Sequence, residues 1–444
     1  MDKTKDLHQI VIVGGGAGGA ELAKKLGDSL GKRKQAKVIL IDSKMTHVWK
    51  PLLHEVAAGT LNPSIEGMEY ISHAFHHNYH FRLGYMDRVD KDAKEISLAP
   101  TFDEKGEEII ARRSFRYDTL IISVGSLTKH FNTKGVVEHC QFLDSLEQAN
   151  NFHSYLLTKM IKAQARTQDL RSGELHVAIV GAGATGIELA AELHGATKQL
   201  IAYGFDNIEA LRDVKITIVE ASPKILPALP ERLSKATLTE LDKLGIEVLT
   251  DERVIEVQKE GLHTHSGKFI PAETVVWAAG VKAPNFLAKI QGLESNDINQ
   301  LLVKTTLQTT QDDDIFAFGD CASCPMIGKE GFVPPRAQAA HQQASLLAKS
   351  IRNRLEDKEL LEYKYVDYGS LVNLGRYSTV GSLMGNLMGR WSGSLSVEGF
   401  LARMVYKSLY RMHLISLHGY TREILMTIAN WINNRGLKPR LKLH

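Results

Sequence analysis

Cysteine is scarce in this chain, with three residues among 444. Three thiols cannot form a disulfide framework, so a disulfide-stapled scaffold is excluded and a reducing compartment is indicated. Long apolar runs are also missing: none approaches the roughly 18 apolar residues of a membrane-spanning helix. No signal peptide is expected, because the first nine residues lead directly into an apolar strand. The 43% hydrophobic and 24% charged residues are typical of a globular protein of two or three domains.

A glycine fingerprint, in contrast, is present twice. The first copy contains Gly14, Gly16 and Gly19, and the second contains Gly181, Gly183 and Gly186. Each copy follows an apolar strand and opens an amphipathic helix, which is the context that the motif requires. The first glycine allows a tight turn, the second lets the backbone approach a pyrophosphate, and the third lets the helix pack closely on the strand. Two copies predict two bound dinucleotides and electron transfer between them.

An acidic residue ends the strand that follows each fingerprint. These acids are Asp42 and Glu220, and a carboxylate at this position accepts hydrogen bonds from the ribose hydroxyls of an adenosine. Glu220 also repels a 2′-phosphate, so the second site is expected to prefer NADH to NADPH. Because Glu220 lies unusually far beyond Gly186, the intervening helix is expected to extend to about Leu211.

The order of the strands predicts the fold. A buried strand leads to Gly125 after the first fingerprint, another leads to Gly280 after the second, and a third ends at Gly319 and Asp320. This order predicts an α/β fold of two nested Rossmann-like dinucleotide-binding domains. The first domain is expected to span residues 1–150 and to resume over 301–375, and the second is expected to span 151–300. Residues 376–444 are expected to form a C-terminal membrane-association region.

The C-terminal residues 398–444 are basic and amphipathic. They carry an excess of six positive charges, whereas the whole chain has a net charge of +3. At about 100° per residue, apolar side chains from Leu401 to Ile415 fall on one arc, and a second stretch from Tyr420 to Ile432 repeats the pattern. Such helices lie in a membrane interface, and basic residues add attraction to anionic lipid. An ordinary docking helix or a dimer contact is the alternative interpretation.

The chain resembles the bacterial type II NADH:quinone oxidoreductases, the single-subunit respiratory NADH dehydrogenases, over essentially its full length. The residues that carry the resemblance are 14–19, 47–59, 181–194, 275–280, 318–325, 333–342 and 378–386. The segment Ala337–Gln342, with Gln338 and Gln342 one helical turn apart, is the most diagnostic.

The resemblance implies a two-dinucleotide-binding flavoprotein with FAD at the first fingerprint and NADH at the second. Asp42 would hold the FAD adenosine, Asp320 would contact its ribityl or pyrophosphate region, and the loop containing Lys50 and Pro51 would follow the ribityl chain. Gln338 and Gln342 would lie beside the isoalloxazine, and Glu188 would lie near the nicotinamide and the quinone pocket.

The resemblance further implies a respiratory enzyme that does not pump protons. Hydride would pass from NADH to FAD, and two electrons would then pass to a membrane quinone. The protein would lie peripherally on the cytoplasmic face of the bacterial membrane, anchored by residues 398–444, with a homodimer through the C-terminal region and no nucleic-acid partner. The alternatives are a soluble reductase of a disulfide or an electron carrier, a sulfide:quinone oxidoreductase and an NADH-sensing module.

Two further clusters have less specific interpretations. Cys321 and Cys324 form a CxxC motif, which is typical of redox dithiols or of half a metal site. Its position after Asp320 favours a structural role. The histidines between His73 and His80 share a helix face, which is interpreted as solvated, and no metal site is expected.

Overall fold

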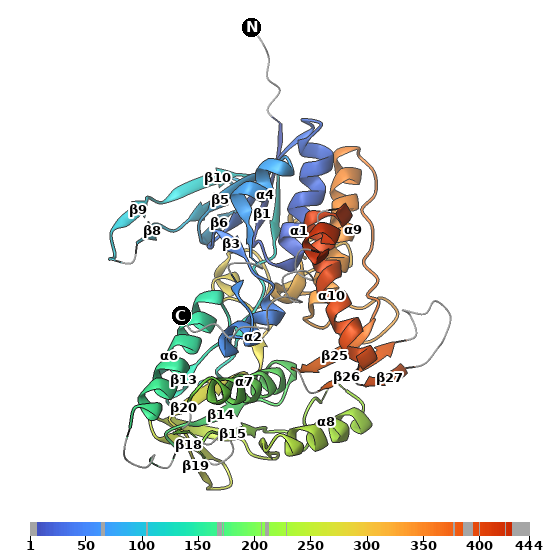
Figure 1. The fold of residues 1–444 in the computed structure, drawn as a ribbon. Coiled ribbons are helices and arrows are strands. Elements are labelled where there is room, and N and C mark those ends of the chain that lie inside the picture. The colour runs from blue at the N-terminus through green and yellow to red at the C-terminus, as the bar shows by residue number, and fades with distance from the viewer. Residues whose placement is uncertain are drawn as a thin grey trace. The chain divides into compact units, whose positions relative to one another are not determined.

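The computed structural model describes residues 7–428 apart from 64–66, 104, 167–170, 172, 206, 209–212, 228, 376–377, 385–393, 399 and 422. The chain divides into two compact units (Figure 1). The first unit comprises Met1–Trp49, Gly67–Leu127 and Val281–Asp367, and the second comprises Lys50–Glu66, Thr128–Gly280 and Tyr368–His444. Each unit is therefore assembled from separated segments of the chain, as nested domains require.

A parallel five-stranded sheet forms the centre of the first unit. Its order is β23-β11-β1-β2-β5, with bounds β1 His8–Val13, β2 Ala36–Asp42, β5 His80–Leu83, β11 Thr119–Ile122 and β23 Ile315–Ala317. The four strands β1, β2, β11 and β23 are largely apolar and buried, as expected when helices cover both faces of a sheet, whereas the edge strand β5 exposes His80 and Arg82. Helices α1 (Ala17–Leu26) and α9 (Ala337–Leu355) pack against each other beside this sheet.

Shorter elements complete the first unit. They include an antiparallel sheet β10-β7-β6 and a small hairpin, β8-β9. The bounds are β3 Thr46–His47, β4 Met68–Glu69, α4 Tyr70–His76, β6 Met86–Asp90, β7 Glu95–Leu98, β8 Thr101–Phe102, β9 Glu108–Ile110, β10 Arg113–Arg116, β22 Leu301–Leu302 and β24 Ala322–Ser323.

A second parallel sheet repeats the arrangement in the second unit. Its order is β13-β20-β14-β15-β16, with bounds β13 Cys140–Gln141, β14 His176–Val180, β15 Lys215–Val219, β16 Glu247–Leu249 and β20 Thr274–Trp277. In each sheet the fingerprint strand lies between the strand that leads to the acid and the closing strand. The predicted nested Rossmann-like fold is therefore confirmed.

The helix after the second fingerprint is shorter than predicted. Helix α7 spans Ala184–Ala202, so the predicted end at about Leu211 is wrong. Tyr203 and Gly204 form a turn after it, and Gly204 has φ +112°. A glycine in this region of φ commonly ends a helix. The described residues 203–205, 207–208 and 213–214 are not helical, so part of the long spacing before Glu220 lies outside the helix.

The remaining elements of the second unit include two antiparallel sheets, β17-β18-β19 and β25-β26-β27. The bounds are α2 Leu53–Ala58, α5 Val136–His139, α6 Leu146–Gln164, α8 Glu231–Lys243, β17 Val254–Gln258, β18 Gly261–Thr264, β19 Phe269–Pro271, β25 Gly369–Leu374, β26 Ser378–Met384, β27 Ser394–Glu398 and α10 Phe400–His418. Helix α10 packs on the last of these sheets. Among the described residues, no helix is long and apolar enough to cross a membrane.

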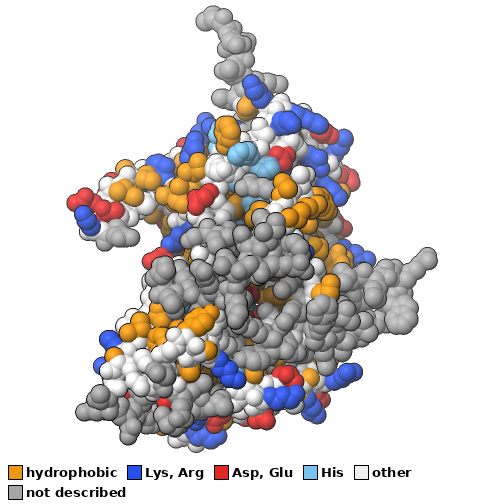
Figure 2. Space-filling model, in the orientation of Figure 1, with side chains coloured by type: hydrophobic (Ala, Val, Ile, Leu, Met, Phe, Trp, Pro, Cys, Tyr) orange, Lys and Arg blue, Asp and Glu red, His pale blue; other side chains and the backbone are white. Residues whose placement is uncertain are grey.

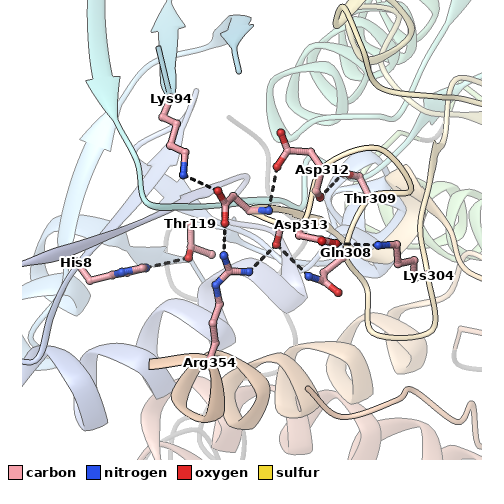
Figure 3. Close-up of polar contacts among 10 residues, drawn as sticks. His8, Lys94, Thr119, Lys304, Gln308, Thr309, Asp312, Asp313 and Arg354 are labelled. Atoms are coloured by element: carbon pink, nitrogen blue, oxygen red, sulfur yellow. Dashed lines mark hydrogen bonds and ion pairs between the residues drawn. The ribbon is translucent and has the colours of Figure 1, made fainter. Parts of the chain in front are cut away.

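A polar network holds helix α9 to the amino edge of the first sheet (Figure 3). The Arg354 guanidinium at the end of α9 donates to Asp314, the residue before β23, and Lys94 donates to the same carboxylate at 2.5 Å. Burial raises the pKa of Asp314, but these two cations outweigh it and hold the pKa below its usual value. The network lies opposite the carboxyl edge, where ligands bind in such sheets, so we assign it a structural role.

Candidate functional site

The two glycine fingerprints adopt the same backbone geometry. Gly14 and Gly181, the first glycines, have φ of +99° and +107°, which residues with a side chain rarely adopt. A Cβ added to the third glycines would lie 1.8 Å from the Gly14 carbonyl oxygen at Gly19 and 2.1 Å from the Gly181 carbonyl oxygen at Gly186. Each helix therefore packs on its strand at a separation that only glycine allows.

The second glycine of each fingerprint faces open space. A Cβ added to Gly16 or Gly183 would meet no atom within 4 Å. Both residues precede the first turn of a helix, where unpaired N–H groups and the helix dipole attract phosphate. The space and the donors fit a pyrophosphate at both loops, and so fit FAD as well as a nicotinamide dinucleotide.

The predicted ribose-binding acids stabilise the glycine loops. Asp42 accepts from the Gly15 N–H at 2.6 Å and from the Lys44 N–H at 2.9 Å. Glu220 accepts from the Ala182 N–H at 2.7 Å and from the Ser222 N–H at 2.8 Å, which is the same pattern. Each carboxylate oxygen keeps a lone pair for a ribose hydroxyl. The structure thus brings each acid to its fingerprint.

Residues from distant parts of the chain meet at the carboxyl edge of the first sheet. Ser126, which follows Gly125, donates its hydroxyl to the Asp320 carboxylate at 2.8 Å. The buried Gln343 side chain of α9 accepts from the Gly319 N–H at 2.8 Å. No motif indicated Gln343, since it is one more glutamine in a helix already rich in them.

Tyr70 is a second residue that no motif indicated. Its buried hydroxyl donates to the Gly15 carbonyl oxygen at 2.6 Å, and a Cβ added to Gly15 would lie 2.4 Å from that hydroxyl. Burial and the nearby Asp42 carboxylate raise the Tyr70 pKa well above its usual value, so the hydroxyl keeps its proton and remains a donor. Tyr70 therefore supports the first glycine loop.

The glutamate repeated in both fingerprint helices has opposite properties in the two copies. In α1, burial raises the Glu21 pKa, but hydrogen bonds from His341 and Lys25 outweigh it and lower the pKa to about 2. In α7, burial and the neighbouring carboxylates of Glu55 and Glu192 raise the Glu188 pKa to about 8. At neutral pH, Glu21 is ionised and ties α1 to α9, whereas Glu188 is largely protonated.

Glu188 lies in a buried polar cluster of the second unit. Its Oε1 accepts from the Asn373 N–H at 2.9 Å, and its Oε2 lies 3.7 Å from Nδ1 of His54 on α2. Burial lowers the His54 pKa to about 4, so the imidazole is neutral and the pair is not an ion pair at neutral pH. The buried Tyr406 hydroxyl has no hydrogen-bond partner among the described residues, and these carboxylates add to the increase in its pKa that burial causes. Glu188 can therefore hold a proton at neutral pH in this buried cluster.

Gln338 and Gln342 both lie on α9, and their side chains contact residues 363–367 of the same unit. The Gln338 amide donates to Asp367 at 3.3 Å. The Gln342 amide donates to the Val366 carbonyl oxygen at 2.7 Å, and its oxygen accepts from the Val366 N–H at 3.0 Å. These bonds fix both side chains against one segment. Their contact with a flavin or a quinone stays a prediction.

The loop at residues 49–52 leads the chain from one unit into the other. Lys50 and Pro51 begin a short 3₁₀ turn, Lys50–Leu52, that continues into α2. The Lys50 ammonium lies 3.5 Å from the Asp144 carboxylate. Its contact with the FAD ribityl chain stays a prediction.

The cysteine and histidine clusters have structural roles. Cys321 and Cys324 are buried, and burial raises the pKa of both thiols to about 12, so neither is a reactive thiolate. The predicted solvated helix face is wrong in part: His73 is buried and hydrogen-bonded to the Tyr79 hydroxyl at 2.8 Å, and His80 lies on β5 beyond the end of α4. His77 contacts Asp28. Histidine side chains gather over α4 (Figure 2), yet no group of metal-ligating side chains occurs among the described residues.

Comparisons with known proteins agree with this geometry. The family model for pyridine nucleotide-disulphide oxidoreductases matches residues 8–344. A type II NADH:quinone oxidoreductase of Haemophilus influenzae is 45% identical over 99% of this chain and 100% of its own length. A Staphylococcus aureus protein of the same name is 27% identical over 91% of this chain and 96% of its own. In fold, the chain is similar to a Plasmodium falciparum NDH2 in complex with NADH, with a TM-score of 0.81, 20% identity and coverage of 98% and 99% of the two chains.

The two copies of the glycine loop, the nested sheets and the match to the family model define a flavin-dependent reductase that binds two dinucleotides. The chain belongs to the pyridine nucleotide-disulphide oxidoreductase family and, within it, to the type II NADH:quinone oxidoreductases.

Proposed function

We propose that this chain transfers electrons from NADH to a membrane quinone, with FAD at the first glycine loop and NADH at the second. The observation that carries the proposal is the duplicated site: two loops of one geometry, each with an open second glycine and an acid bonded to its backbone. Bound FAD supplies the redox chemistry by accepting a hydride from NADH and passing two electrons to the quinone. The chain's own residues would bind FAD and NADH, orient the quinone and supply it with a proton.

Two of the proposed FAD-binding residues, Asp42 and Asp320, follow strands at the carboxyl edge of the first sheet. Asp42 would bind the adenosine ribose, and Asp320, held by Ser126, would bind nearer the flavin. Lys50 and Pro51 would lie along the ribityl chain. The segments proposed from the sequence are 1–150 and 301–375 for FAD, 151–300 for NADH and 376–444 for membrane association. The compact units divide the chain differently, because residues 50–66 and 128–150 lie in the unit of the second glycine loop and residues 281–300 in that of the first.

Quinone reduction is assigned to the two glutamines of α9 and to the buried acidic cluster. Gln338 and Gln342 would position the flavin or a quinone carbonyl, since both amides carry donors and acceptors. A quinone takes up two protons on reduction, and Glu188 holds a proton at neutral pH because burial and two carboxylates raise its pKa to about 8. Glu188 is therefore our candidate for a proton donor.

Glu220 should make the enzyme selective for NADH. Its carboxylate is held toward the second glycine loop by the Ala182 and Ser222 N–H groups, where it would accept from the ribose and repel a 2′-phosphate. The purified protein is expected to be yellow and to reduce a short-chain quinone with NADH much faster than with NADPH. The two steady-state rates with a soluble ubiquinone analogue are the measurement, and Glu220→Gln should narrow their ratio. Equal rates with both nucleotides in the unaltered protein would contradict the role of Glu220, and no quinone reduction would contradict the function.

The C-terminal helices are proposed to bind the cytoplasmic face of the membrane. Helix α10 and the helical residues that follow it carry several exposed apolar side chains, which are Met404, Leu409, Met412, Tyr420, Ile424, Leu425 and Ile428. Other side chains of α10 are buried, namely His413, Leu414 and Leu417. Trp431, Ile432 and the basic end of the tail lie outside the described residues. The same surface is the candidate interface of a homodimer.

Loss of the exposed apolar side chains should release the protein from membranes. Deletion of residues 398–444 would also remove the buried side of α10, so we expect Met404→Gln with Met412→Gln to separate binding from folding. The double variant should stay at the bottom of a flotation gradient with anionic vesicles while it keeps its FAD absorbance. Ser408→Gln, at an exposed position on the same side of α10, is the matched control and should still float. If the double variant floats as the unaltered protein does, the anchor lies elsewhere.

A further inference from the structure

An exposed aromatic side chain, Phe131, lies beside the end of β20, the closing strand of the second unit. Phe131 is 54% exposed, and its ring lies against Gly280, where an added Cβ would be 2.6 Å from the ring edge. Gly280 itself has φ +68° and follows β20 at the carboxyl edge of the second sheet. The glycine thus leaves room for this ring as well as for the turn.

The loop that carries Phe131 is bonded to the same strand end. The Trp277 indole N–H donates to the Lys129 carbonyl oxygen at 3.0 Å, and the Lys129 N–H donates to the Gly280 carbonyl oxygen at 3.3 Å. The Lys129 ammonium also lies 5.0 Å from the centroid of the Phe131 ring. The position of the ring is therefore set by several contacts with the end of β20.

The backbone at this point is strained. Phe131 and Asn132 have φ of +53° and +55°, in the left-handed region that is unfavourable for a bulky side chain. Hydrogen bonds within the loop hold the conformation: the Asn132 N–H donates to the His130 imidazole at 3.2 Å and the Thr133 N–H to the His130 carbonyl oxygen at 3.0 Å. Strained residues concentrate at binding sites, and this one exposes an aromatic ring to solvent.

The strand order of the second sheet indicates which half of a bound dinucleotide would lie near this ring. The adenosine half is assigned to β15, which leads to Glu220, and β20 lies on the other side of the fingerprint strand β14. A dinucleotide whose pyrophosphate crosses the second glycine loop must extend its other half toward the end of β20. That end is the position of Gly280 and Phe131.

We propose that Phe131 binds the nicotinamide ring of NADH, as an aromatic wall against which this ring packs. The inference rests on the proposed NADH site at the second glycine loop. The side chain need not take part in the reaction, because an aromatic ring provides a large, rigid contact surface at a low cost in conformational entropy. Phe131 would therefore affect binding of NADH and leave the quinone step unchanged.

The test uses the FAD-loaded, full-length protein and compares its affinity for NAD⁺ with its affinity for ADP-ribose. Phe131→Gly removes the ring and also relieves the strained backbone, so this variant should fold at least as well as the unaltered protein. It should raise the KM for NADH by about tenfold, an effect typical of one lost aromatic contact, while the KM for quinone and the kcat at saturating NADH stay constant. By calorimetry, NAD⁺ should bind more weakly to the variant, whereas ADP-ribose, which lacks the nicotinamide, should bind equally to both proteins.

Two control variants complete the experiment. Phe131→Tyr keeps the ring and should restore the KM, and Phe269→Ala removes an exposed ring on β19 of the same unit and should change nothing. Unchanged NAD⁺ affinity in Phe131→Gly, or an equal loss for ADP-ribose, would overturn the inference while the proposed function stands. Failure of the unaltered protein to bind NAD⁺ would instead remove the proposed NADH site, and the inference with it.

Discussion

Replacement of Gly183 by valine is expected to lower the kcat/KM for NADH on the order of 100-fold and to leave FAD bound. Gly183 has φ −76° and ψ −178°, an extended backbone that valine adopts readily, and an added Cβ would meet no atom within 4 Å. The fold should therefore persist, while the new side chain fills the space assigned to the NADH pyrophosphate. Loss of one or two charge-assisted hydrogen bonds lowers affinity on the order of 100-fold. The kcat/KM for NADH and the flavin absorbance of the purified variant are the two measurements.

Two matched substitutions control this prediction. Gly16→Val makes the same change at the first loop, where the backbone is also extended, and it should give a colourless protein. Gly195→Ala lies on α7 beyond the loop, with open space around it, and should leave both properties unchanged. A yellow Gly183→Val protein with an unaltered KM for NADH would be inconsistent with a nucleotide at the second loop.

Substitution of Glu188 by glutamine should stabilise the protein increasingly as the pH rises. The Glu188 pKa is about 8 in the folded protein and near its ordinary value when unfolded. Between these values the unfolded chain releases a proton that the folded protein retains, so the stability of the unaltered protein falls by about 1.4 kcal/mol for each pH unit. Glutamine has no such proton and can still accept from the Asn373 N–H. The melting temperature of Glu188→Gln relative to the unaltered protein should therefore rise from pH 5 to pH 8.

Glu21→Gln is the matched control, because Glu21 occupies the same position of the first fingerprint. Its pKa is about 2 in the folded protein, so its contribution to stability is complete above the unfolded value and is lost only as the pH falls toward 2. The melting temperature of Glu21→Gln should lie below that of the unaltered protein by the same difference at every pH from 5 to 8. If the two variants show the same pH dependence, the opposite protonation states that we assign are incorrect.

The contrast between these glutamates illustrates what a sequence pattern can predict. The strands, fingerprints and terminal acids depend on residues close together in the chain, and both Asp42 and Glu220 lie beside their glycine loops, as their positions at the ends of strands predicted. Their contacts with ribose stay predictions. The protonation of Glu21 depends on His341, and that of Glu188 depends on Glu55 and on Asn373, all of them distant in sequence. A local pattern contains no information about such partners.

Errors and omissions have the same origin. The spacing before Glu220 predicted a longer helix because length alone does not distinguish a helix from a connection. Tyr70 and Gln343 support the two glycine turns of the first site, yet neither belongs to a motif. The contacts of Gln338 and Gln342 with FAD or quinone stay predictions, since the structure shows only their bonds to residues 363–367.

Helix α9 connects the two edges of the first sheet as a single stiff rod. Arg354 fixes one end to Asp314, and Gln343 fixes the helix to the Gly319 turn near the other. From Gln338 to Arg354 the helix rises about 24 Å, at roughly 1.5 Å for each residue. Because the helix is continuous, its anchorage at the amino edge helps to fix the position of the two glutamines near the opposite edge. The position of these two glutamines is thus set in part by contacts on the far side of the sheet.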